Sequence, residues 1–236
     1  MNGPPGAEVV GLPRRKRGGG LAACDLVLAT DLDGTFLGGT AADRGRLYGF
    51  IEAHREEVGL VFVTGRSLEA VRPLVDDTAI PTPDLVIGDV GASVAEGATL
   101  APIAAIEAEL RVGWPGRAAV RAMLADLHLT EQAVPQRGRV SYAVEDAATV
   151  AICRMRAEAS GLSVVYSCGR YLDVLPPRVD KGRALDAVLA RLGVARDRVL
   201  VCGDTLNDRA LYGRGLRGVV VGGAEPALTL ATRGLR

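Results

Sequence analysis

The sequence predicts an α/β protein in which a Rossmann-like, doubly wound parallel sheet is interrupted by a smaller α+β insert. From residue 25 to about residue 97, and again after residue 181, short apolar β-branched runs alternate with helical stretches. The runs are apolar throughout, which is typical of parallel strands covered on both faces. Between these two regions the order helix, strand, strand occurs twice, which indicates a small α+β unit with an antiparallel sheet.

The elements follow from local patterns in chain order. In the first region we expect strands at 26–30 and 59–65, helices at about 43–58 and from about 67, and a strand leading into a Gly-punctuated hairpin at 83–97. In the insert we expect helices at 115–128 and 147–160, the first beginning at Pro115, and strands at 129–135, 138–144, 162–168 and 170–176. The first pattern then resumes with a helix at 181–192, a strand at 198–204, a helix from about 207 and a strand at 218–223.

These elements set the expected domain boundaries. Residues 1–23 hold Gly, Pro and the run RRKRGGG and read as a flexible tail, with a contact arm for an acidic partner or a start codon placed too far upstream as alternatives. Residues 24–112 and 174–236 would form the core, and residues 113–173 the insert.

Composition narrows the classes of function. Of the 236 residues 48% are apolar, and 28 basic residues balance 28 acidic ones, so nucleic acid and anionic membranes are not expected as partners. A small, possibly anionic ligand stays open. No apolar run is long enough for a membrane span and no secretory signal is evident, so we expect a cytoplasmic protein of unspecified oligomeric state.

The four cysteines show no close pairs and are interpreted as small buried hydrophobic residues, with a reactive thiol at Cys202 as the weaker alternative.

Polar residues follow the strands of the predicted parallel sheet. Ligands of such sheets bind beyond the carboxyl ends of the strands, so these residues should share one crevice. They are Asp31 and Asp33; Thr64, Gly65 and Arg66; and Asp204, Asn207 and Asp208.

Four aspartates in one crevice require a cation. One aspartate after a strand often only caps the next helix, and Asp43 is interpreted that way. Four that converge from distant segments are harder to explain by capping, and carboxylate oxygens with an amide beside them suit Mg²⁺.

Two further features indicate phosphate. Thr64 and Gly65 precede a predicted helix start, where a hydroxyl, free backbone N–H groups and the helix dipole attract anions. Of the 28 basic residues only Lys16 and Lys181 are lysines, so Lys181 is expected to need a compact ammonium, although a chance surface lysine is the alternative.

Four segments resemble the ordered motifs of the haloacid dehalogenase superfamily of phosphohydrolases: DLDGT at 31–35, VTGR at 63–66, DKGRAL at 180–185 and GDTLND at 203–208. The resemblance implies that Asp31 is the nucleophile, forming an aspartyl phosphate, and that Asp33 is the acid and base. It also implies that Asp31, the backbone carbonyl of Asp33, Asp204 and Asp208 hold Mg²⁺. The phosphoryl group would be bound by Thr64, Gly65, Arg66, Lys181 and Asn207.

The insert resembles the type C2B cap of subclass IIB in that superfamily. The segments GRVSYAV (138–144) and SCGRYLDVLPPRVDKGRAL (167–185) are similar to the sucrose-phosphate phosphatase group, although Arg139 stands where that group usually has lysine. Polar residues in and beside the loops of the insert are candidates for substrate contacts. As alternatives, Tyr142 would be a core residue and Arg170 a residue of a solvated turn. The candidates are Gln136, Arg139, Ser141, Tyr142, Arg170 and Asp173.

Together these features predict a Mg²⁺-dependent phosphatase acting on a sugar phosphate. The enzymatic alternative is a phosphomutase or phosphotransferase that passes the phosphoryl group to another sugar hydroxyl. The alternative from another class is a phospho-receiver or sugar-phosphate-binding module without turnover, against which the DLDGT pair and the large insert both count. The fold does not choose among sugars.

Overall fold

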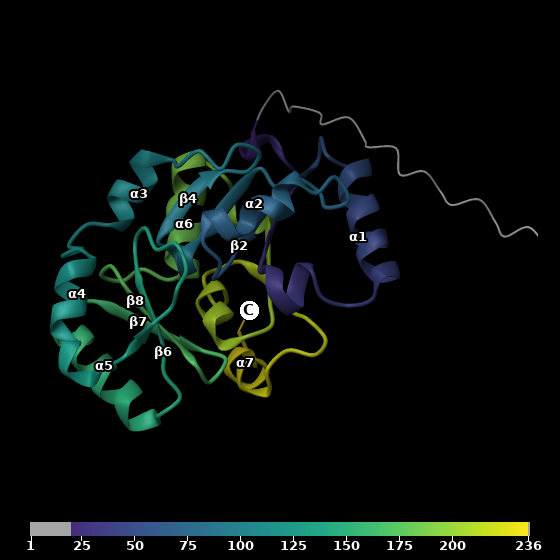
Figure 1. The fold of residues 1–236 in the computed structure, drawn as a ribbon. Coiled ribbons are helices and arrows are strands. Elements are labelled where there is room, and N and C mark those ends of the chain that lie inside the picture. The colour runs from purple at the N-terminus through teal and green to yellow at the C-terminus, as the bar shows by residue number, and fades with distance from the viewer. Residues whose placement is uncertain (1–19, 236) are drawn as a thin grey trace, which may run out of the picture.

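Two β-sheets organise the chain in the computed structural model, which describes residues 20–235 (Figure 1). The larger sheet has the strand order β10-β9-β1-β2-β3-β4, and the smaller sheet has the order β5-β6-β8-β7. All neighbours in the larger sheet pair in parallel except β3 and β4, which are antiparallel. The predicted doubly wound parallel sheet with an antiparallel second sheet is confirmed.

The larger sheet and its helices come from both ends of the chain. Its strands are β1 (Leu26–Thr30), β2 (Val58–Val63), β3 (Leu85–Gly88), β4 (Ser93–Glu96), β9 (Val199–Gly203) and β10 (Arg217–Val220). Its helices are α1 (Ala41–Ala53), α2 (Leu68–Asp76), α3 (Ala104–Leu110), α6 (Lys181–Leu192) and α7 (Pro226–Thr232). The sequence did not predict α3 or α7, which are both two turns long, and residues after 206 form a short 3-10 helix, η6 (Leu206–Leu211).

Helix α6 begins and ends at the predicted residues. The Asp180 carboxylate caps its start by accepting from Arg183 N at 2.7 Å, and Gly193 ends it in a left-handed conformation. The cap matters because the first residue of the helix is Lys181.

Strand β1 lies between β2 and β9, so segments far apart in the sequence end at the same edge of the sheet. Two apolar clusters cover the two faces, one with Val27, Val61 and Val201 and the other with Leu28, Leu60 and Phe62. This burial on both faces explains why the strands are apolar throughout.

The smaller sheet carries helices on one face only. Its strands are β5 (Thr130–Glu131), β6 (Val140–Ala143), β7 (Ser163–Ser167) and β8 (Tyr171–Leu175), and its helices are α4 (Arg117–Met123) and α5 (Ala147–Ala159). In Figure 1 both helices lie on the side of this sheet away from the larger one. We call residues 113–175 the small domain; β8 continues past residue 173, where we expected the insert to end, and Leu175 packs in the main core.

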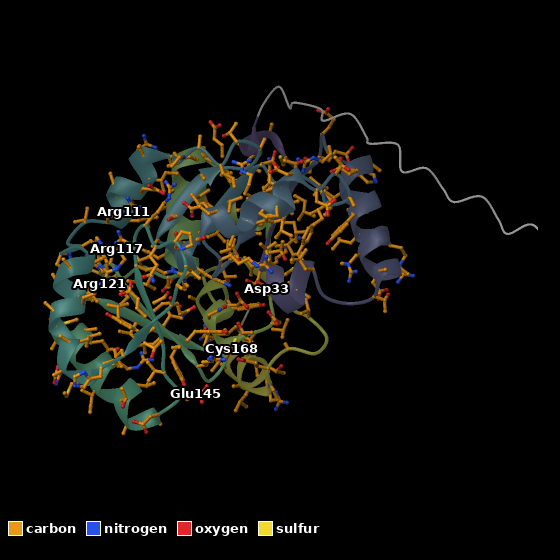
Figure 2. The ribbon with its side chains drawn as sticks, viewed as in Figure 1. Asp33, Arg111, Arg117, Arg121, Glu145 and Cys168 are labelled. Carbon is orange, nitrogen blue, oxygen red and sulfur yellow. The ribbon has the colours of Figure 1, made fainter. Side chains whose placement is uncertain are left out.

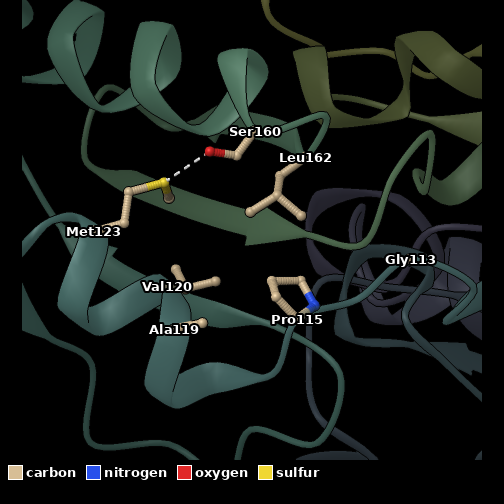
Figure 3. A pocket seen from close by; sticks show the side chains of 7 residues that line it. All are labelled: Gly113, Pro115, Ala119, Val120, Met123, Ser160 and Leu162. Carbon is tan, nitrogen blue, oxygen red and sulfur yellow. Dashed lines mark hydrogen bonds between the residues drawn. The ribbon is translucent and has the colours of Figure 1, made fainter.

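A pocket of about 250 Å³ lies in the small domain between α4 and the end of α5 (Figure 3). It is lined mainly by apolar side chains, including Val120 and Leu162, and the Ser160 hydroxyl donates to Met123 Sδ at 3.4 Å across it. It contains none of the residues that the motifs single out.

The last residues of the expected tail are folded. Residues 1–19 lie outside the described residues. Leu21–Ala23, however, form a 3-10 helix, and the Leu21 side chain is buried in the main core against Gly59. Expecting a tail up to residue 23 was therefore wrong at its last residues, because one apolar side chain is enough to anchor a short turn.

The four cysteines differ in exposure. Cys24 and Cys153 are buried, as expected, whereas Cys168 is exposed. Cys202 is partly buried, and burial raises its pKa to about 11, which disfavours a reactive thiol. Within residues 20–235 no helix combines the length and the hydrophobicity that crossing a membrane requires.

The burial of Leu21 gives a stability prediction. Replacing Leu21 with alanine should lower the free energy of unfolding by about 2–4 kcal/mol, because a cavity forms in a packed core. Urea unfolding measures the change. Leu230→Ala is the control, since that side chain is 68% exposed and should change the free energy by less than about 0.5 kcal/mol. Equal effects of the two substitutions would contradict the placement of Leu21 in the core.

Candidate active site

Asp31 stands at the carboxyl end of β1 and is the most central carboxylate of the site. Its backbone N–H donates to Cys202 O at 2.9 Å, which ties it to β9, and the residue is only 5% exposed. Leu32, the next residue, points into the core. Because Leu32 packs in the apolar core, the chain turns Asp31 and Asp33, on either side of it, away from that core.

The turn after Asp31 depends on Gly34. Its φ is +79°, and a Cβ at this position would lie 2.1 Å from Asp204 Oδ2. Thr35 adds a hydrogen bond from its hydroxyl to Asp204 Oδ1 at 3.1 Å. The turn thus brings Asp204, from the end of β9, against the end of β1.

Three carboxylates form one cluster. One oxygen each from Asp31, Asp204 and Asp208 lie within 4.8 Å of one another. Asp208 also closes the loop that carries Asp204, because its Oδ2 accepts from the N–H groups of Asp204 and Thr205, both at 3.1 Å.

The Asp33 carboxylate does not belong to this cluster. It accepts two hydrogen bonds from Arg66, at 2.5 Å from Nη2 and 2.8 Å from Nε. The Asp33 side chain is more than half exposed, and Figure 2 shows it at the edge of the core that faces the small domain. The predicted phosphate ligand Arg66 is thus engaged with a carboxylate in this conformation.

Lys181 is completely buried at the centre of the site. Its Nζ donates to Asp31 and Asp208, both at 2.6 Å, and to Asn207 Oδ1 at 2.9 Å. A single nitrogen with three donors in different directions serves these three acceptors, as the scarcity of lysine indicated. The alternative of a chance surface lysine is wrong.

The charges in this cluster do not balance. Burial raises the pKa of Asp31 to about 6, only partly offset by the Lys181 ammonium. Burial alone would lower the pKa of Lys181, but Asp31 and Asp208 together hold it above its usual value. Burial also raises the pKa of Asp204. Three carboxylates with one ammonium therefore form a site that favours a further cation.

Thr64 follows the last residue of β2, at the same edge of the sheet where Asp31 follows β1. The residue is 1% exposed, and its Oγ1 accepts from Arg66 N at 3.1 Å, which leaves the hydroxyl hydrogen free to donate. Gly65 follows, and α2 begins three residues later with Ser67 as its cap. Asn207 lies on the other side, where its Oδ1 also accepts from Thr205 Oγ1.

The predicted contacts from the small domain differ in position. Ser141 and Asp173 are paired neighbours in the sheet, on the face without helices, and both are buried. Tyr142 lies on the opposite face, in the apolar core with α4 and α5, because consecutive strand residues alternate. This placement matches the alternative core role rather than a substrate contact.

The remaining three candidates have partners within the protein. The Gln136 side chain stabilises the loop that contains it, because it accepts a hydrogen bond from Ser141 N and donates one to Gln132 O. Arg139 is buried in ion pairs with Asp89 and Asp173. Arg170 is exposed, 3.6 Å from Glu145, as expected for a solvated turn.

The sequence did not single out Cys168, in the turn between β7 and β8. Strand β7 contacts η6, and Figure 2 labels Cys168 between the small domain and the core. Burial, followed by the charges of Glu225 and Asp204, raises the pKa of its thiol. This turn therefore lies near the carboxylate cluster, and it also carries Arg170, which the sequence had singled out.

The fold and the arrangement of Asp31, Lys181 and the paired acids after β9 define a haloacid dehalogenase-like protein. Solved structures agree: the chain superposes on a sucrose-phosphatase from Synechocystis, in complex with sucrose and phosphate, with a TM-score of 0.77 and 26% identity over 88% of this chain and 86% of that one. The sequence model of the sucrose-6F-phosphate phosphohydrolase family matches residues 24–235. The chain belongs to this family.

Curated relatives differ in length. The chain is 46% identical to a glucosylglycerol-phosphate synthase of Pseudomonas anguilliseptica over 88% of its own length but only 28% of the relative's. It is 33% identical to a mannosylfructose-phosphate phosphatase of Agrobacterium fabrum, over 86% of this chain and 85% of that protein. It spans about half, 52%, of a tobacco sucrose-phosphatase at 30% identity.

The raised pKa of Asp31 gives a pH-dependent prediction. The folded protein should bind more protons than the unfolded chain between about pH 4 and 6, so the contribution of Asp31 to stability falls as pH rises through this window. Asp31→Asn should therefore stabilise the metal-free protein at pH 7.5 by about 1–3 kcal/mol, and the gain should disappear near pH 4.

Urea unfolding in EDTA at several pH values measures this difference. Asp43→Asn is a control of opposite sign: hydrogen bonds from Thr40 lower the pKa of Asp43, so removing its charge should destabilise the protein at pH 7.5. A loss of stability in Asp31→Asn at pH 7.5 would mean that the ion pair with Lys181 outweighs the cost of burial.

Proposed function

We propose that the chain is a Mg²⁺-dependent phosphatase that hydrolyses a sugar phosphate through an aspartyl-phosphate intermediate. The observation that carries the proposal is the buried Lys181 ammonium against Asp31, beside Asp204 and Asp208. A nucleophilic carboxylate, a fixed cation and further acids for a metal are the parts that phosphoryl transfer requires.

Mg²⁺ would be held by Asp31, Asp204 and Asp208 with the backbone carbonyl of Asp33. Two features of these residues suit Mg²⁺. Three hard carboxylate oxygens lie within 4.8 Å of one another, and the negative charge around Lys181 exceeds the charge of its ammonium. When bound, Mg²⁺ would neutralise charge on the phosphoryl oxygens and help to orient them.

The reaction would proceed in two steps. The Asp31 carboxylate attacks phosphorus, and the bond from phosphorus to the sugar oxygen breaks as the carboxylic acid of Asp33 gives that oxygen its proton. The Asp33 carboxylate then takes a proton from water, which attacks the aspartyl phosphate and releases inorganic phosphate. Both proton transfers require Arg66 to release the Asp33 oxygens that it holds in this conformation.

The phosphoryl oxygens would be bound by donors around Asp31. The candidates are the Thr64 hydroxyl, the backbone at Gly65 and the Lys181 ammonium, with Asn207 orienting the ammonium. Arg66 would join them after it releases Asp33. These fixed donors favour the charge that develops in the transition state.

The small domain would recognise the sugar. Ser141, Asp173 and Arg139 lie on the face of its sheet that carries no helices, and Gln136 and Arg170 come from adjoining loops. The charged members of this set already have protein partners. We therefore expect the sugar to compete for those partners or to contact the exposed turn at Arg170 and Cys168.

The relatives favour a phosphorylated glycoside as the substrate class. Their names refer to sucrose, mannosylfructose and glucosylglycerol phosphates, in each of which a sugar is joined to a second polyhydroxylated unit. We propose that this chain acts on a phosphate of that kind, in the cytoplasm and without nucleic acid or membrane as partner.

A panel of glycoside phosphates and hexose phosphates tests the activity. With Mg²⁺ we expect release of inorganic phosphate from at least one glycoside phosphate, and EDTA should abolish it. Asp31→Asn should lower kcat by about 10³-fold or more, because the amide is no nucleophile. Full activity in this variant would exclude the aspartyl-phosphate route.

Single-turnover products separate the alternatives. Transfer of the phosphoryl group to a second sugar, rather than to water, would indicate a phosphotransferase. One round of slow dephosphorylation would indicate a receiver.

The role of Asp33 predicts a dependence on the leaving group. Asp33→Asn should slow the first step strongly for a sugar phosphate, whose alkoxide needs a proton, and much less for p-nitrophenyl phosphate, whose phenolate does not. Rapid-quench bursts measure this step separately from water attack. Equal slowing of both bursts would contradict the role of Asp33 as proton donor.

A further inference from the structure

The loop between β3 and β4 holds two unfavourable backbone conformations in succession. Asp89 has φ of +52° and Val90 has φ of +57°, and neither is glycine. The left-handed region costs roughly 1–2 kcal/mol for an ordinary residue and is rare for a β-branched one. Such strain persists only where surrounding contacts impose it, and it gathers at functional positions. We call residues 89–91 the strained loop.

The backbone of the strained loop holds the predicted phosphate-binding segment. The Asp89 N–H donates to Arg66 O at 2.8 Å, and the Val90 N–H donates to Thr64 O at 3.1 Å. These two carbonyls flank Gly65. The left-handed conformations and the position of Thr64 are thus fixed by the same hydrogen bonds.

The third residue of the loop packs on the start of α6. At Gly91 φ is +106°, and a Cβ would lie 2.4 Å from Asp180 O and 3.1 Å from Lys181 N. The loop therefore touches the backbone of both residues, Thr64 and Lys181, that are proposed to bind the phosphoryl group.

The side chain of Asp89 reaches the small domain. It is fully buried; its Oδ2 accepts from Ser93 Oγ at 2.7 Å, and its Oδ1 lies 3.1 Å from Arg139 Nε. The contact between Arg139 and Asp89 is an ion pair without a hydrogen bond. Arg139 is 5% exposed and donates from Nη1 to Asp173 Oδ1 at 3.0 Å, where the Ser141 hydroxyl donates as well. One buried guanidinium thus joins the small domain to the strained loop.

Removing Arg139 would leave the buried Asp89 carboxylate without a cation, whereas removing Asp89 would leave Arg139 paired with Asp173. Burial raises the pKa of Asp89, and the Arg139 charge counteracts this. Breaking such a pair from one side is far more costly than breaking an exposed one. The loop therefore depends on the small domain being seated, whereas an exposed pair would add little.

We propose that the Arg139–Asp89 ion pair couples the seating of the small domain to the geometry of the phosphate-binding residues Thr64 and Lys181, which makes Asp89 and Arg139 positioning residues. The inference rests on the proposed function. With the small domain seated, the ion pair holds the strained loop, and the loop holds both phosphate ligands. When the small domain moves away, Asp89 loses its cation, the loop relaxes, and the phosphate ligands shift.

The coupling is tested by measuring the kinetics of a substrate without a sugar, p-nitrophenyl phosphate. We expect Arg139→Gln and Asp89→Asn each to lower kcat for p-nitrophenyl phosphate, and to weaken binding of inorganic phosphate with Mg²⁺, by about tenfold or more. The double variant should lose no more than the more affected single variant, because both remove the same interaction. Arg139→Lys should lose less than Arg139→Gln, since it keeps the charge.

The control is a second ion pair between the two domains. Arg137 Nη2 lies 3.0 Å from Glu69 Oε1, with both side chains exposed and neither in the strained loop. Arg137→Gln should stay within about twofold of the original protein in both measurements. A similar loss in this variant would mean that any cross-domain pair suffices, and would overturn the specific role of Asp89.

Other results also decide the matter. If Arg139→Gln raises KM for the sugar phosphate alone and leaves p-nitrophenyl phosphate turnover and phosphate binding unchanged, Arg139 is a sugar contact and the coupling is wrong. If Arg139→Gln is too unstable to purify, Arg139→Lys and Asp89→Asn carry the test. Absence of turnover in the original protein would refute the proposed function instead, and phosphate binding would still test the coupling.

Discussion

The buried ammonium of Lys181 is the interaction on which the rest of the site depends. It joins Asp31 at the end of β1 to Asp208 in η6, partners that lie 150 and 27 positions away in the sequence. Without this cation three carboxylates would meet in a largely buried cluster with no compensation. The cap of α6, the order of the strands and the turn at Gly34 can all be understood as means of bringing those groups to one nitrogen.

The site is assembled at a cost in stability. It contains a carboxylate whose pKa is raised by burial and a loop with two left-handed non-glycine residues. Both are supported by neighbours and neither is explained by packing alone. Natural proteins concentrate such costs at functional positions, which is consistent with the location of both features around the same crevice.

Two arginines connect the parts of the molecule in different ways. Arg66 holds Asp33 at an exposed edge, where contact with solvent keeps the pair easy to break. Arg139 joins the two domains from a buried position, where its loss leaves the Asp89 carboxylate without a cation. The first arrangement suits a group that must be released during a reaction cycle. The second suits one that reports whether the small domain is in place.

The sequence by itself determined the sheet, the strand-end residues and the family, because buried parallel strands and the DLDGT and GDTLND segments are local patterns. It also singled out Lys181, because lysine is rare in this chain. Only the tertiary structure decided what partners these side chains have. Arg139 was expected to contact the sugar and is also an ion-pair partner of Asp89. Tyr142 packs in the core of the small domain, and Leu21 packs in the main core. Such outcomes depend on contacts between distant segments, which local propensity and periodicity do not encode.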